Sequence, residues 1–101
     1  MTFIQTLSFV VRDEGEFNAV MEEWEREGSQ QESGPRRVWV MRDRDRPNAY
    51  LVSAEFSSYE QAMENSARPE TDAMARRLGE LTESGVEYGN YDLVREQAPS
   101  A

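Results

Sequence analysis

The fold of this chain is decided by its central stretch, RRVWVMRDRDRPNAYLVSAEFSS, residues 36–58. Residues 36–44 and 49–57 are rich in valine and aromatic side chains, and each run splits by parity into two faces, as strands do. Arg46-Pro47-Asn48 supplies the residues of a turn between them. Two strands separated by so short a turn pair as an antiparallel hairpin.

On the N-terminal side of the hairpin, the sequence predicts a strand followed by a helix. Residues 3–12 alternate an apolar parity with a mixed one, which is typical of a strand. The stretch 13–28 predicts a helix that begins after its N-cap, Asp13, and ends before Gly28. Its apolar side chains recur at i, i+3, i+4 and i+7: Phe17, Val20, Met21 and Trp24.

On the C-terminal side, a helix and a strand are predicted again. Ser58 and Gln61 have the spacing of a capping box, so a helix should begin there. Pro69 interrupts this helix and restarts it as a first-turn residue, and the apolar stripe continues to about Thr82. Residues 86–95 then predict the last strand.

The resulting order, β-α-β-β-α-β, predicts an α+β, ferredoxin-like fold with a four-stranded antiparallel sheet and helices on one face. We expect residues 1–96 to form a single domain, because about 100 residues make one core. Residues 97–101 are expected to be a frayed tail.

The sheet face without helices is predicted to be too apolar for a monomer. A solvated face should be polar at alternate positions of every strand. Apolar patches of more than a few hundred Å² are uncommon on monomers, so we expect a homodimer closed sheet to sheet. The alternative is that the parity slips by one residue in one or two strands. The expected members of this face are Ile4, Val10, Trp39, Met41, Leu51, Tyr91 and Leu93.

Three common catalytic side chains are missing from this sequence: histidine, cysteine and lysine, all 11 basic residues being arginine. This excludes Ser-His-Asp triads, thiolate nucleophiles and Schiff-base lysines. We expect no cofactor and no metal site.

The net charge of −9 argues against nucleic acid as a partner, because it repels a phosphate backbone. The sequence has no run of eighteen apolar residues and no basic leader at its start, so we expect no membrane association and a cytoplasmic protein.

The order of elements, with RDRDRPNAYLVSAEFSSYEQAMENSARPET at residues 42–71, resembles the dimeric α+β barrel superfamily that includes the antibiotic-biosynthesis monooxygenases. The chain is most similar to an uncharacterised stand-alone branch, and the resemblance covers about residues 3–95. It implies the fold, a homodimer, and a pocket between sheet and helices or within the barrel. Cofactor-free oxygenation in this superfamily relies on an asparagine, a tryptophan and sometimes a histidine, so the missing histidine disfavours a haem-degrading role.

Two polar residues are candidates for catalysis, Glu55 and Asn65. Glu55 lies on the non-helix parity of a central strand, where a lone carboxylate is costly to bury. It should pair with Arg37 or Arg95, or otherwise serve as a general base. Asn65 either caps the helix break before Pro69 or lines the mouth of the pocket that the superfamily implies.

Five further residues are candidates for a ligand pocket: Trp39, Met41, Tyr50, Asn90 and Tyr91. The aromatic residues among them could form a wall for a ligand, or could simply pack in a dimer interface. Two functions stay open. The protein binds a small hydrophobic metabolite as a dimeric module, or it is a cofactor-independent monooxygenase-like enzyme for an aromatic or quinol-type substrate. Whether it is an enzyme is not decided by its sequence.

Overall fold

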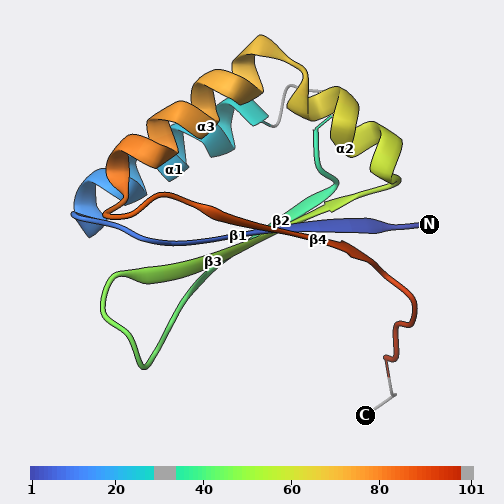
Figure 1. Ribbon diagram of the computed structural model, residues 1–101, viewed down its shortest axis with the longest axis horizontal. Coiled ribbons are helices and arrows are strands. Elements are labelled where there is room, and N and C mark those ends of the chain that lie inside the picture. Colours follow the sequence, from blue (N-terminus) through green and yellow to red (C-terminus); the bar gives the residue numbers. More distant parts are fainter. Residues whose placement is uncertain (29–33, 99–101) are drawn as a thin grey trace.

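A computed structural model describes residues 1–28 and 34–98 of the chain as a curved sheet covered on one face by helices (Figure 1). Its elements, in chain order, are β1 (Phe3–Val10), α1 (Glu14–Gly28), β2 (Arg37–Arg42), β3 (Ala49–Phe56), α2 (Tyr59–Ser66), α3 (Pro69–Leu81) and β4 (Glu87–Asp92). This order confirms the ferredoxin-like prediction, with the second helix divided in two.

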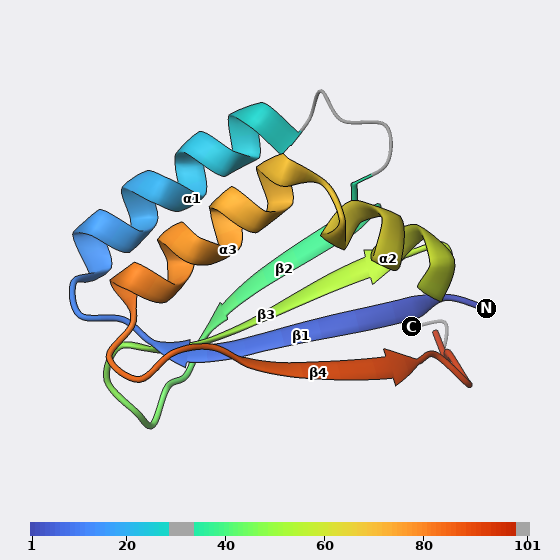
Figure 2. The same ribbon diagram turned by 45° about the horizontal axis from the view of Figure 1, so that its top comes forward.

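The four strands form one antiparallel sheet in the order β2-β3-β1-β4, so β2 and β4 lie at its edges (Figure 2). Residue Leu7 of β1 is opposite Val52 of β3 and Tyr88 of β4. Val40 of β2 is also opposite Val52, so these side chains share the face that carries the helices. The predicted parity of all four strands is therefore correct, with no slip of one residue.

Local signals place the helix boundaries as expected. The Asp13 carboxylate accepts a hydrogen bond from the backbone N–H of Glu16, at 3.0 Å, as an N-cap does. Ser58 caps α2 by accepting from the N–H of Gln61, and Pro69 begins α3. Gly28 is still part of α1, one residue later than predicted.

The strands are one to three residues shorter at their ends than predicted. The turn of the β2–β3 hairpin contains Asn48 with a φ of 60°, a left-handed conformation that asparagine tolerates. In Figure 1 this turn and the segment after β4 lie on the side of the sheet opposite the helices. Most of the predicted loop at 29–35, and residues 99–101 of the predicted tail, lie outside the described residues.

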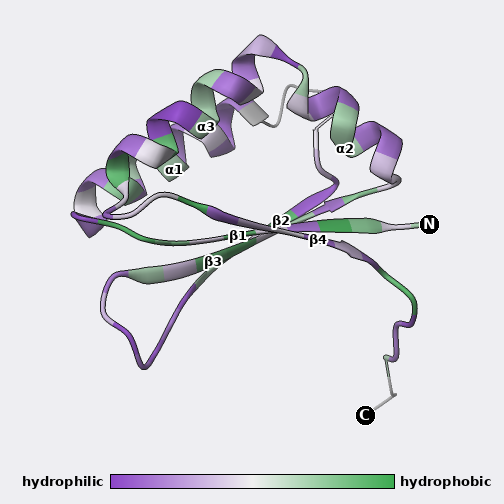
Figure 3. Ribbon diagram, viewed as in Figure 1, coloured by the Kyte–Doolittle hydropathy of each residue, from purple (hydrophilic) through white to green (hydrophobic). Residues whose placement is uncertain are grey.

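The core lies between the helices and the two central strands, β1 and β3. One buried cluster joins Phe9 and Tyr50 of the sheet to Phe17 of α1, with rings 4.6–6.2 Å apart. A second, under α2, contains Phe3, Ala54, Phe56 and Ala62. The turn of the hairpin is hydrophilic (Figure 3). Neither core cluster includes a residue of the edge strand β2. All six residues of β2 are exposed, so the helices leave this strand uncovered.

Candidate functional site

The structure divides the candidate residues between the two faces of the sheet. We call the face away from the helices the open face. Register places Glu55 opposite Arg37 and Ile4 on the open face. The other candidates on the open face are Trp39, Met41 and Tyr91, whereas Tyr50 and Asn90 lie on the helix face and Asn65 lies in α2. Of the five predicted pocket residues, Met41 and Tyr50 line one pocket together, and Trp39, Asn90 and Tyr91 are not among its lining residues.

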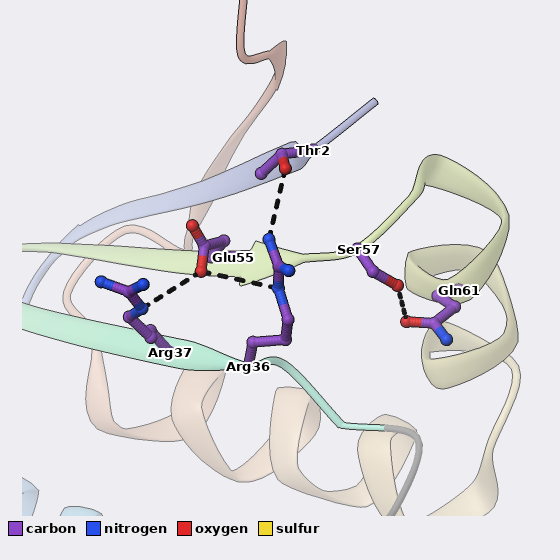
Figure 4. A network of polar contacts seen from close by, with 6 residues as sticks. All are labelled: Thr2, Arg36, Arg37, Glu55, Ser57 and Gln61. Carbon is purple, nitrogen blue, oxygen red and sulfur yellow. Dashed lines mark hydrogen bonds and ion pairs between the residues drawn. The ribbon is translucent and has the colours of Figure 1, made fainter. Parts of the chain in front are cut away.

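Glu55 is the most buried polar group of the open face, with 9% of its surface exposed. Its Oε2 lies 3.4 Å from Nε of Arg37 and 3.7 Å from Nε of Arg36 (Figure 4). Arg36 also donates a hydrogen bond to the Thr2 hydroxyl, at 3.2 Å. The predicted pairing of Glu55 with an arginine is confirmed for Arg37.

This ion pair limits what Glu55 can do as a base. Oε2 accepts no hydrogen bond from any described residue, so two guanidinium groups offset its burial mainly by Coulomb attraction. Arg37 and Arg36 are 71% and 51% exposed, so both cations remain hydrated on their outer sides. The arrangement is that of a charge-compensated carboxylate on the floor of the open face.

The rest of the open face is apolar and only partly covered. Trp39, Met41, Leu51 and Tyr91 are between 41% and 59% exposed. Trp39 and Met41 come from the edge strand β2, Leu51 from β3 and Tyr91 from the other edge. The apolar surface therefore extends across the whole width of the sheet.

In β4, the absence of a side chain at Gly89 leaves space for the ring of Tyr91. A Cβ added to Gly89 would lie 2.7 Å from Cε2 of Tyr91 and 2.5 Å from the hydroxyl oxygen of Thr6. Both distances are shorter than any ordinary contact. A side chain at position 89 would therefore require the Tyr91 ring and the Thr6 hydroxyl to move.

A pocket of about 670 Å³ opens at the hairpin end of the sheet. Met41 and Leu51 of the open face, with Val10 of β1, supply its apolar part. Its lining also includes four charged residues, Arg42, Asp43, Arg46 and Glu87. The volume falls in the range of small-molecule sites, although this lining is more polar than that of most such sites.

Tyr50 lines the same pocket from the helix side. Burial raises the pKa of its phenol, and the neighbouring Glu14 carboxylate raises it further, while Arg42 acts in the opposite direction. The phenol therefore stays neutral at physiological pH. Tyr50 can donate a hydrogen bond but is a poor base.

Asn65 lies at the end of α2 and bridges the break between α2 and α3. Its side-chain oxygen is 3.5 Å from the hydroxyl of Thr71, and its backbone oxygen accepts from the N–H of Arg68. These contacts fit the expectation that Asn65 caps the break. Asn90 is exposed on the edge strand β4. The catalytic and ligand-binding roles of all these residues stay predictions.

Among residues 1–28 and 34–98, no three acidic side chains are grouped so that they could hold a metal ion. Within the same residues, each helix is too short or too polar to cross a membrane.

Comparison with known proteins identifies the fold. No protein-family model matches the chain, and no curated protein matches its sequence. Among solved structures it is similar to SnoaB, a cofactor-independent oxygenase from Streptomyces nogalater, with 23% identity, 98% of each chain covered and a TM-score of 0.80.

Two provisionally named antibiotic biosynthesis monooxygenases are also similar to the chain. The protein from Caulobacter crescentus CB15 is 14% identical, with 93% of this chain and 91% of that chain covered and a TM-score of 0.80. The protein from Deinococcus radiodurans is 12% identical, with 100% of both chains covered and a TM-score of 0.77. The chain therefore shares the fold of these solved structures, which is the fold that its sequence resemblance implied.

Proposed function

We propose that this chain, which has the fold of the antibiotic-biosynthesis-monooxygenase-like proteins, forms a homodimer that binds a small hydrophobic metabolite between its two sheets. The observation that carries the proposal is the open face, where Trp39, Met41, Leu51 and Tyr91 are all about half exposed. Such a surface is unfavourable in water.

A second copy of the chain is the simplest cover for this face. A twofold axis places the same apolar surface on both sides of the contact, so apolar atoms meet apolar atoms. Two four-stranded sheets together make an eight-stranded barrel. A barrel of that size is filled by side chains or holds one small ligand.

The pocket of about 670 Å³ is the space we assign to the ligand. Its apolar part includes Met41, Leu51 and Val10, which suit a hydrophobic molecule. Trp39 is not a lining residue of the pocket, but it lies on the same face of β2 as Met41 and would meet a ligand held between the two sheets. Arg46 and Glu87 in the lining can bind polar substituents.

Light scattering and calorimetry test the two halves of this proposal separately. We expect the mass of a dimer at micromolar concentration, and measurable heat on titration with 2-naphthol. Trp39→Ala should weaken naphthol binding. Trp24→Phe, which changes the half-buried tryptophan packed on the helix-side core, is the matched control and should not. A monomer with no heat of binding would refute both halves.

The second candidate function is a cofactor-independent monooxygenase-like activity on an aromatic or quinol-type substrate. It is favoured by the structural likeness to SnoaB, which is a cofactor-independent oxygenase. Glu55 and Asn65 are the residues we assign to it. Consumption of dissolved oxygen with 1,4-naphthalenediol, above the uncatalysed rate and reduced by Asn65→Ala, would support this function. Binding without oxygen consumption would leave the binding module as the function.

A further inference from the structure

One carboxylate oxygen of Glu55 is an unused hydrogen-bond acceptor on the open face. The other oxygen, Oε2, is enclosed by the protein and faces Arg36 and Arg37. Oε1 points away from both guanidinium groups (Figure 4), is not enclosed in this way, and accepts no hydrogen bond from any described residue. Because a carboxylate oxygen accepts through two lone pairs, Glu55 can still bind a donor that approaches over this face.

The strand register determines which side chains lie beside this acceptor. Glu55 shares its row of the open face with Tyr91, because Ile4 is opposite both of them. The next row along the strands contains one large aromatic residue and three small ones: Trp39, Ser53, Thr6 and Gly89. Two aromatic side chains and a line of small residues are thus next to the carboxylate.

The following row connects the acceptor to the pocket described above. Leu51, which lines that pocket, is four residues from Glu55 on β3, or about 13 Å along an extended strand. A molecule that contacts both side chains must lie over Ser53, beside Trp39. Its apolar end would be in the pocket and its other end at the carboxylate.

From these positions we propose that the ligand of the open face is an aromatic alcohol, whose hydroxyl group donates its hydrogen to Oε1 of Glu55. The inference rests on the ligand binding proposed above and states the class of ligand. A hydrogen bond to an ionised acceptor is stronger than one between neutral groups. A ligand carboxylate has no hydrogen to donate and would meet the negative charge of Glu55, whose two arginines are already paired with it.

Covering the open face with a second copy makes this preference larger. The cover removes water from Oε1, and a buried acceptor without a donor is costly. A ligand hydroxyl replaces the lost water, whereas a ligand of the same shape without a donor leaves the acceptor unsatisfied. Sites built to bind a hydroxyl group reject the analogue that lacks it for this reason.

Three probes with one ring system test the inference by calorimetry: 2-naphthol, 2-methoxynaphthalene and naphthalene. Only 2-naphthol has a hydrogen to donate. Its dissociation constant should be lower than that of either analogue by about tenfold or more, because the hydrogen bond is made to a charged group. Naphthalene separates the loss of the hydrogen from the added bulk of the methyl group.

Two variants assign the preference to Glu55. In Glu55→Gln the ratio between the analogues and 2-naphthol should fall to about threefold or less, because a neutral amide oxygen is a weaker acceptor. Glu80→Gln makes the same charge change at an exposed position of α3 and is the matched control. It should keep the full ratio.

The possible results separate this inference from the proposed function. If the wild type binds none of the three probes, both are overturned. Equal affinities for the three probes overturn the inference but leave the binding of hydrophobic molecules in place. A preference for 2-naphthol that is unchanged in Glu55→Gln assigns the hydroxyl to another acceptor, and overturns the inference as well.

Discussion

Removing the two arginines beside Glu55 should destabilise the protein more than removing Glu55 itself. At 3.4 Å and an effective dielectric constant of about 20, the attraction between Glu55 and Arg37 is about 5 kcal/mol before the costs of desolvation. The glutamate side chain is 12% exposed and the arginines 71% and 51% exposed, so most of the desolvation falls on the carboxylate.

Replacing Glu55 and replacing the two arginines therefore leave behind charges that water solvates to different extents. Glu55→Gln leaves two arginines that water can solvate, and should lower the free energy of unfolding by about 1 kcal/mol. The double variant Arg36→Ala/Arg37→Ala leaves a buried carboxylate without compensation, and should lower it by about 3 kcal/mol. In that double variant, the further change Glu55→Gln should raise stability again.

Urea unfolding followed by circular dichroism measures all four proteins, at one protein concentration because a dimer's stability depends on it. A loss for Arg36→Ala/Arg37→Ala equal to or smaller than that for Glu55→Gln would contradict the argument. So would a further loss when Glu55→Gln is added to the double variant, because the carboxylate would then not be the destabilising group.

Two other predictions follow from single side chains. Gly89→Ala brings a methyl group within 2.7 Å of the Tyr91 ring and should lower the free energy of unfolding by about 1–2 kcal/mol. Gly79→Ala in α3, where an added Cβ has nothing within 4 Å, should raise the free energy of unfolding by about 0.5–1 kcal/mol. Thermal unfolding measures both variants, and equal effects would refute the contact at Gly89. The folded-state pKa of Tyr50 is raised above its ordinary value of 10.0, so the contribution of its neutral phenol to stability is complete below pH 10 and is lost as the pH rises through the folded-state pKa. Ultraviolet titration should show one late-ionising phenol, and its pKa should fall in Glu14→Gln. An unchanged titration in that variant would count against the role of Glu14.

Much of the fold could be predicted because its signals are local. The turn at Asn48, the N-cap at Ser58 and the restart at Pro69 each depend on the backbone preferences of a few neighbouring residues. The two faces of each strand followed from a period of two, which is a property of the extended backbone itself. The order of these elements then left few topologies to choose from.

The candidate site was less predictable, because its contacts join residues distant in the chain. The sequence favoured Arg37 or Arg95 as the partner of Glu55, and only the register of β2 against β3 placed Arg37, with Arg36 beside it, at the carboxylate. Parity alone separated Trp39 from Tyr50, but how far each is covered depended on where the helices lie.

By itself, then, the sequence determined the elements, their faces and the absence of histidine, cysteine and lysine chemistry, since these depend on residue identity and short-range backbone geometry. The tertiary structure alone decided that β2 and β4 are the edge strands, and how far each residue of the predicted apolar face is covered. Strand order and helix placement decide this, because they arise from burying one shared core, to which every segment contributes and which no single segment encodes.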